Sequence, residues 1–428
     1  MSVVINSVQA WEALDSRGHP TVAARVGLSD GGEGVAMVPA GASAGSHEAV
    51  ELRDGEPRYL GRGVRRAVAN VIGLAPRLVG LAPAEVDPVL ADADPSPGFM
   101  ALGANAVLAV SIAAARADAA AAGMSLARRL AGADGPLLLP MPMVNVLSGG
   151  AHAGAMLDVQ DFLVIPVGAT SFAQAIEWAG AVRTAAAKLA VRRGFPQAVL
   201  VADEGGVGVP LRSNRAALDL LTDAISEAGL VPGVDAAIAI DIAATQFHDA
   251  GYYRLACEDR VLSAGELVDE LVEWCAKYPI VSLEDVLAED DWPGWQAATA
   301  ALGDRVQLIG DDLFVTSSER LARGIDTGVA NSVLVKVNQN GLLSGAKAVV
   351  DLARAKGYST VVSARSGETE DDWLADLAVG WRAGQIKVGS THRSERTAKW
   401  NRLLRLEATE HTTFAGPWVG GLVPKEQS

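Results

Sequence analysis

Residues 280–285 read IVSLED, a short apolar run that ends directly in two carboxylates. Similar runs recur on both sides of it, separated by amphipathic stretches of helical length. The predicted strands are 162–167, 198–202, 236–240, 280–283, 306–309, 332–335, 360–362 and 385–388, and the predicted helices include 215–228, 264–277 and 342–356. This alternation predicts an α/β fold, either a closed (β/α)8 barrel or an open doubly wound sheet.

The residues that end these runs favour the barrel. A single acid after a strand is most simply the N-cap of the next helix. Here, however, ionisable or polar residues lie at or near the end of one strand after another: Asp203, Glu204, Asp241, Glu284, Asp285, Asp311, Asp312, Lys336, Arg365, Ser366 and Lys387. In a barrel all of these strand ends meet at one face, where the active site is built.

The first third of the chain has a different pattern. Strand-like runs at 3–14, 21–28 and 34–38 precede helical segments at 64–78 and 104–131, and a proline-rich join follows at 138–142. We therefore predict two domains. Residues 1–135 form a smaller α+β capping domain with a mobile loop, and residues 140–428 form the catalytic barrel.

The composition of the chain indicates which binding partners and which cellular compartment to expect. The formal net charge of −15 argues against a nucleic-acid or anionic-membrane partner, because both require a positive field, so we expect neither. Residues 1–10 lack the features of a signal peptide, and we interpret the alanine-rich stretch 106–122 as a packed helix. The two cysteines, Cys257 and Cys275, are too few for a disulfide framework, so we expect a cytoplasmic protein.

Three of the strand-end acids suggest a metal site. Asp241, Glu284 and Asp311 would form an all-oxygen site that suits Mg²⁺ better than zinc, since no histidine or cysteine cluster accompanies them. Lys336 and Lys387 should face the same mouth. They either pair with these acids or, with a lowered pKa, one of them acts as a base.

The chain resembles the enolase family along almost its whole length. The matching segments are residues 15–18 (DSRG), 41–43 (GAS), 48–55 (EAVELRDG), 203–206 (DEGG), 282–285 (SLED), 310–313 (GDDL), 336–339 (KVNQ), 365–370 (RSGETE) and 384–387 (GQIK). The resemblance implies a Mg²⁺-dependent lyase that acts on a small phosphorylated carboxylate through an enolate intermediate. It also implies a homodimer.

The roles of individual residues follow from the same resemblance. Two Mg²⁺ ions are expected, the tighter one on Asp241, Glu284 and Asp311 and the second on Ser43 of the loop. Lys336 would remove the proton next to the substrate carboxylate, and Glu204 would serve the leaving hydroxyl. The remaining expected contacts are Arg365 and Ser366 for phosphate, Lys387 for carboxylate, and His152, Gln160 and Asp161 as further pocket residues, with His152 and Asp161 counted among the catalytic groups.

Two pocket positions depart from the family pattern. Ala364 stands where the family has histidine, and Asp161 where it has glutamate; Ala40, Ser148 and Asn340 are milder changes. We therefore favour a specialised paralog similar to the carboxyphosphonoenolpyruvate synthases of phosphonate antibiotic biosynthesis, with a nucleotide-activated phosphonoformate as co-substrate. The alternatives are an ordinary glycolytic enolase, which dehydrates 2-phosphoglycerate to phosphoenolpyruvate, and a degenerate enolase with a binding role.

Overall fold

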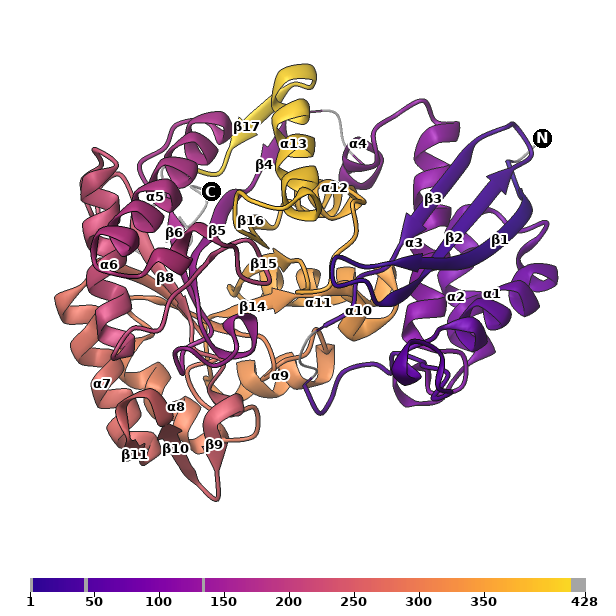
Figure 1. Cartoon of the computed structure of the whole chain (residues 1–428). Coiled ribbons are helices and arrows are strands. Elements are labelled where there is room, and N and C mark those ends of the chain that lie inside the picture. Colours follow the sequence, from indigo (N-terminus) through magenta and orange to yellow (C-terminus); the bar gives the residue numbers. More distant parts are fainter. Residues whose placement is uncertain (1–2, 42–44, 133–134, 417–428) are drawn as a thin grey trace.

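The computed structural model describes residues 3–41, 45–132 and 135–416. Figure 1 shows a smaller N-terminal part, coloured indigo to purple, beside a larger barrel that contains the rest of the chain. Two backbone hydrogen bonds join the two parts. The N–H of Ala40 donates to the carbonyl of Gly367 at 2.8 Å, and the N–H of Gly367 donates to the carbonyl of Ala40 at 2.9 Å. This bridge lies two residues beyond Arg365, so the N-terminal part borders the predicted site.

An antiparallel meander and helices form the N-terminal part. Its three strands, β1 (Ile5–Leu14), β2 (Pro20–Leu28) and β3 (Glu33–Met37), confirm the predicted runs. The helices are α1 (Arg65–Leu78), α2 (Val86–Ala93), α3 (Ala104–Ala121) and α4 (Leu126–Ala131). The single helix predicted at 104–131 is therefore two, because the chain turns at Gly123, whose φ is +64°.

Helix α3 is long and apolar enough to cross a membrane by length and composition alone. However, 72% of its apolar window is buried inside the protein, and it packs against β2 and β3. It is the core helix of the N-terminal part, as predicted for the alanine-rich stretch.

The larger part is a closed eight-stranded barrel, as predicted. Its strands in sheet order are β5 (Met141–Ser148), β6 (Asp161–Ile165), β8 (Ala237–Asp241), β12 (Ile280–Glu284), β13 (Gln307–Gly310), β14 (Ser332–Val335), β15 (Ser359–Ser363) and β16 (Gly384–Gly389). Pairing of β16 with β5 closes the ring, and the two-residue strand β7 (Val207–Gly208) pairs in parallel with the last two residues of β5. Side chains from alternate positions of these strands form a separate apolar cluster inside the barrel.

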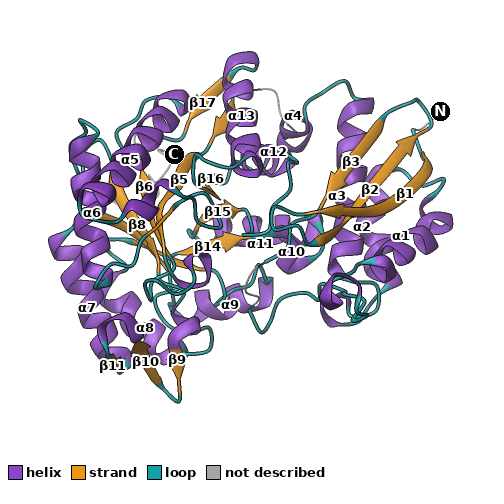
Figure 2. Cartoon of the chain, in the orientation of Figure 1, coloured by secondary structure: helices purple, strands orange, loops and turns teal. Residues whose placement is uncertain are grey.

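Helices surround the barrel (Figure 2). They are α5 (Phe172–Arg192), α6 (Asn214–Glu227), α7 (Ala264–Lys277), α8 (Trp292–Leu302), α9 (Ser318–Thr327), α10 (Val337–Asn340), α11 (Leu343–Ala355), α12 (Trp373–Gly380) and α13 (Ser394–Thr409). A small sheet joins β9 (His248–Asp249), β10 (Tyr252–Leu255) and β11 (Arg260–Leu262), and β4 (Leu137–Leu139) pairs with β17 (Thr412–Phe414). The helices predicted at 215–228, 264–277 and 342–356 correspond to α6, α7 and α11.

One predicted barrel strand is wrong. Residues 198–202 form no strand; Pro196–Val199 is a 3₁₀ turn, and the apolar residues 199–201 that suggested a strand are exposed. The eighth strand is instead β5, which starts at the end of the segment 138–142 that we interpreted as a join. Its one proline, Pro142, weakens the strand pattern because proline cannot donate to a ladder, yet all eight residues of β5 are buried.

Strand β6 runs antiparallel to both of its neighbours, β5 and β8. Its first residue therefore lies at the edge where the parallel strands end, and Asp161 is in register with Asp241. This reversal explains how residues at the start of a strand reach the same face as residues at the ends of the others.

Candidate active site

A narrow cavity lies at this face of the barrel. Nine of the predicted site residues line it: His152, Gln160, Glu204, Asp241, Asp311, Lys336, Arg365, Ser366 and Lys387. Glu284 lies just behind the lining, in contact with Lys387. Asp161 is fully buried and does not line the cavity, and Ser43 lies outside the described residues.

Lys387 joins two of the predicted metal ligands. Its Nζ donates to Asp241 Oδ2 at 2.7 Å and to both carboxylate oxygens of Glu284 at 2.8 Å. Burial tends to raise the pKa of Asp241, but Lys387 outweighs this and holds it below its usual range. Burial and the neighbouring Asp241 raise the pKa of Glu284 well above its usual range, despite Lys387. Lys387 thus compensates only part of the negative charge of Asp241 and Glu284.

The donor set fits a magnesium ion. Carboxylate oxygens of Asp285, Asp311 and Asp312 lie within 4.8 Å of one another, and burial together with Asp311 raises the pKa of Asp312 to about 7. Crowded, buried carboxylates of this kind are stabilised by a cation, and oxygen ligands suit a hard one. Of the three predicted ligands, Asp311 belongs to this cluster, whereas Asp241 and Glu284 are joined to each other through Lys387. All three offer carboxylate oxygens, the donor type that suits Mg²⁺.

Lys336 follows β14 and forms an ion pair with Asp311 Oδ2. Its own backbone N–H donates to Thr316 Oγ1 at 2.9 Å, and Gln339 Nε2 donates to Asp311 Oδ1 at 3.0 Å. Burial tends to lower the pKa of Lys336, but Asp311 raises it overall. Of the two roles considered for this lysine, the structure shows the pairing.

Glu204 is held by a tight turn. The backbone N–H of Ala202 donates to Gly206, and that of Gly205 donates to Ala202. Gly205 has a φ of +85°, and a Cβ there would come within 2.4 Å of the His392 carbonyl oxygen, so this turn requires glycine. Glu204 thus reaches the cavity from a loop, and not from the strand end that the sequence suggested.

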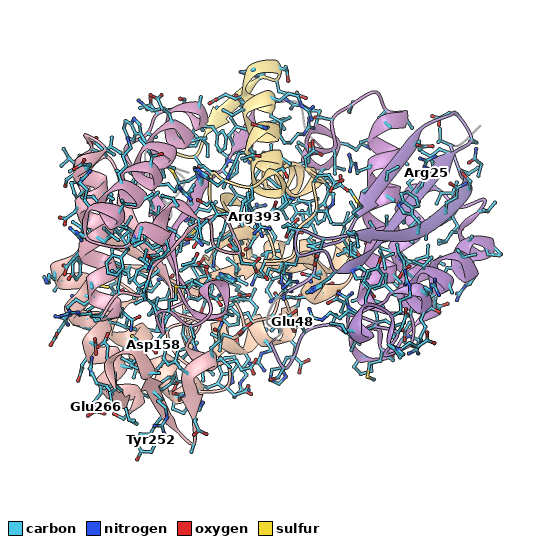
Figure 3. All side chains as sticks on the ribbon, viewed as in Figure 1. Arg25, Glu48, Asp158, Tyr252, Glu266 and Arg393 are labelled. Carbon is cyan, nitrogen blue, oxygen red and sulfur yellow. The ribbon has the colours of Figure 1, made fainter. Side chains whose placement is uncertain are left out.

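Arg365 is paired with a residue of the N-terminal part. Its guanidinium donates to Glu48 from Nη1 at 2.8 Å and from Nη2 at 3.2 Å, and to Asn338 Oδ1 at 2.9 Å. Figure 3 labels Glu48 between the N-terminal part and the barrel. Sequence reasoning missed Glu48 as a site residue, although it begins the EAVELRDG segment on which the resemblance partly rests.

Asp161 supports the cavity from behind. Its carboxylate accepts hydrogen bonds from Asn145 Nδ2 at 2.5 Å and Ser148 Oγ at 3.1 Å, and contacts His152 Nδ1 at 2.8 Å. His152 Nε2 lies 3.8 Å from Glu204 Oε1. Gln160, the residue before Asp161, donates to Asp241 Oδ2 at 3.1 Å. Asn145 was missed because it lies in β5, which was not predicted as a strand.

Comparison with known proteins agrees with this architecture. Residues 5–130 match the family model described as "Enolase, N-terminal domain", and residues 136–420 match "Enolase, C-terminal TIM barrel domain". The chain belongs to the enolase family. A curated enolase from Acidothermus cellulolyticus is 51% identical to it over 408 residues, which cover 94% of each chain. The chain is accordingly an enolase-family enzyme, a carbon–oxygen lyase.

Proposed function

We propose that the protein interconverts 2-phosphoglycerate and phosphoenolpyruvate, the ordinary enolase reaction. The observation that carries this proposal is the meeting of Lys336, Glu204 and Arg365 at one cavity beside the crowded carboxylates. These residues come from distant parts of the chain, and together they offer a base, a group for the leaving hydroxyl and an anion site. The similarity to a curated enolase supports the same choice.

In this proposal the cationic side chains bind the substrate. Arg365 and Ser366 would hold the phosphate, since a guanidinium can donate two parallel hydrogen bonds to its oxygens. Lys387 would contact the carboxylate. Asp241, Glu284 and Asp311 would hold one Mg²⁺ and Ser43 a second, and the ions would stabilise the enolate dianion electrostatically.

Lys336 and Glu204 would carry out the proton transfers. Neutral Lys336 would take the proton from the carbon next to the carboxylate, and Glu204 would serve the hydroxyl that leaves the neighbouring carbon. Lys336 must first lose the proton that its pairing with Asp311 favours.

The specialised paralog is a second candidate. It was the main hypothesis from the sequence, but similarity to an ordinary enolase favours the simpler reaction. The observation that still favours specialisation is the pocket itself: Ala364 lines the cavity with a methyl group where the family has an imidazole, and Asp161 is withdrawn from it. The co-substrate would then be a nucleotide-activated phosphonoformate.

Product analysis separates the two candidates. The purified protein is incubated with Mg²⁺ and 2-phosphoglycerate, with and without a nucleotide-activated phosphonoformate, and the products are followed by phosphorus NMR. Phosphoenolpyruvate as the product in both mixtures supports the ordinary reaction. A new phosphonate that forms only with the co-substrate, while 2-phosphoglycerate alone is not converted, would replace it with the specialised one.

We also propose a cytoplasmic homodimer in which residues 1–135 and 140–428 are the two domains of each subunit. The exposed apolar residues 199–201 offer a surface on which a second copy could pack. Analytical ultracentrifugation tests the dimer, and a mass of one chain at micromolar concentration would contradict it.

A further inference from the structure

His152 lies between the carboxylates of Asp161 and Glu204. Its Nδ1 contacts Asp161 Oδ2 at 2.8 Å, and its Nε2 faces Glu204 Oε1 at 3.8 Å. His152 and Glu204 line the cavity, whereas Asp161 has no exposed surface. The three side chains thus form a line that runs from the protein interior to the cavity.

The buried end of this line is fixed in place. Asn145 and Ser148 from β5 both donate to Oδ1 of Asp161, which leaves Oδ2 for the imidazole. Ser148 and Asp161 are both departures from the family pattern, and they contact each other directly. A longer glutamate at position 161 would extend the carboxylate by about 1 Å, a displacement that matters at a reacting centre.

We infer that Asp161 is a positioning residue that keeps His152 protonated, and that His152 supplies the proton which Glu204 passes to the leaving hydroxyl. This inference rests on the proposed function. Glu204 first takes the proton of His152 Nε2, which leaves the imidazole neutral. As the C–O bond breaks, its electron pair leaves with the oxygen, which takes this proton from Glu204 and departs as water. Glu204 returns to its ionised form, and the electrons of the enolate form the new C=C bond.

The charged groups around Asp161, His152 and Glu204 favour proton transfer from His152 to Glu204. Burial tends to lower the pKa of His152, but Asp161, Glu204 and the more distant Asp241 raise it to about 9. Burial also raises the pKa of Asp161, so both shifts keep a proton on the pair.

The pKa of Glu204 is shifted in the opposite direction, downward. Burial tends to raise its pKa, yet His152 lowers it overall, with help from the cations Arg396, Lys387 and Lys336. An ionised Glu204 has no proton of its own to give. The neighbouring imidazolium can provide one, and a 3.8 Å separation without substrate can shorten when substrate is bound.

Asp161→Asn tests the inference, because asparagine keeps the size of the side chain and removes its charge. In a kcat–pH profile for 2-phosphoglycerate with Mg²⁺, activity requires protonated His152 and falls as the pH rises through its pKa. We expect this basic limb to move down by about 1–3 pH units in the variant. Asp161→Glu, which restores the charge, should return the limb most of the way. His411→Gln, on the surface and distant in sequence, is the matched control and should leave the profile unchanged.

His152→Gln supplies the second measurement. It should lower kcat for dehydration by about 10²–10⁴-fold while Lys336 still exchanges the substrate proton with deuterated solvent. Retained exchange shows that the variant is folded and binds substrate. An unmoved basic limb in Asp161→Asn, or near-normal dehydration by His152→Gln, would overturn the inference. If the wild type itself neither exchanges the proton nor forms phosphoenolpyruvate, the proposed function fails instead.

Discussion

The Glu48–Arg365 pair gives a quantitative prediction. The two side chains are only 7% and 4% exposed, and two hydrogen bonds join them. The arginine proposed to bind phosphate is therefore already occupied by a carboxylate. Phosphate must compete with Glu48 for the same guanidinium, and a neutral residue at position 48 would weaken that competition.

We predict that Glu48→Gln lowers the stability of the free protein and strengthens its binding of phosphate. A hydrogen bond to a charged group contributes about 1.5–3 kcal/mol, so the free energy of unfolding should fall by about that amount. If about 1.4 kcal/mol of this competition is relieved when phosphate binds, the Kd for inorganic phosphate should fall about tenfold. Urea unfolding measures the first quantity, and isothermal titration calorimetry with inorganic phosphate the second.

The matched control is Glu56→Gln, which removes an exposed carboxylate from the same part of the chain. It should change neither quantity. If phosphate bound Glu48→Gln no more tightly than the wild type, Glu48 would not compete for Arg365. Weaker binding would mean instead that the carboxylate helps to orient the arginine.

Two further predictions concern the metal and the altered pocket. Mg²⁺ at 100 times its Kd should raise the free energy of unfolding by about 2.7 kcal/mol, and Asp241→Asn should greatly reduce this gain. Thermal melts across a Mg²⁺ titration measure the gain in both proteins. An equal gain in the variant would show that Asp241 is not a metal ligand. If Ala364 and Asp161 mark specialisation, the double change Ala364→His with Asp161→Glu should raise kcat/KM for 2-phosphoglycerate, whereas a fast wild type and no gain in the variant would favour the ordinary enzyme.

The repeated strand endings made most of the site predictable. Asp241 and Lys336 each follow an apolar run and Lys387 lies near the end of one, and barrel geometry brings such positions to one face. Strand β5 was not predicted, because Pro142 interrupts the strand pattern. Without β5, the antiparallel direction of β6 and the contact of Asn145 with Asp161 could not be predicted either. Glu48 could not be found in this way, because it reaches Arg365 across the interface between the two parts and no local periodicity encodes that contact.

Proton exchange is the most direct test of the central claim, that Lys336 acts as the base in this cavity. Wild-type protein with Mg²⁺ and 2-phosphoglycerate in deuterated water should exchange the hydrogen next to the carboxylate, and proton NMR follows the loss of its signal. Lys336→Ala should abolish this exchange, while calorimetry still detects binding of the substrate. Exchange that continues at the wild-type rate in Lys336→Ala would contradict the account, because another group would then be the base.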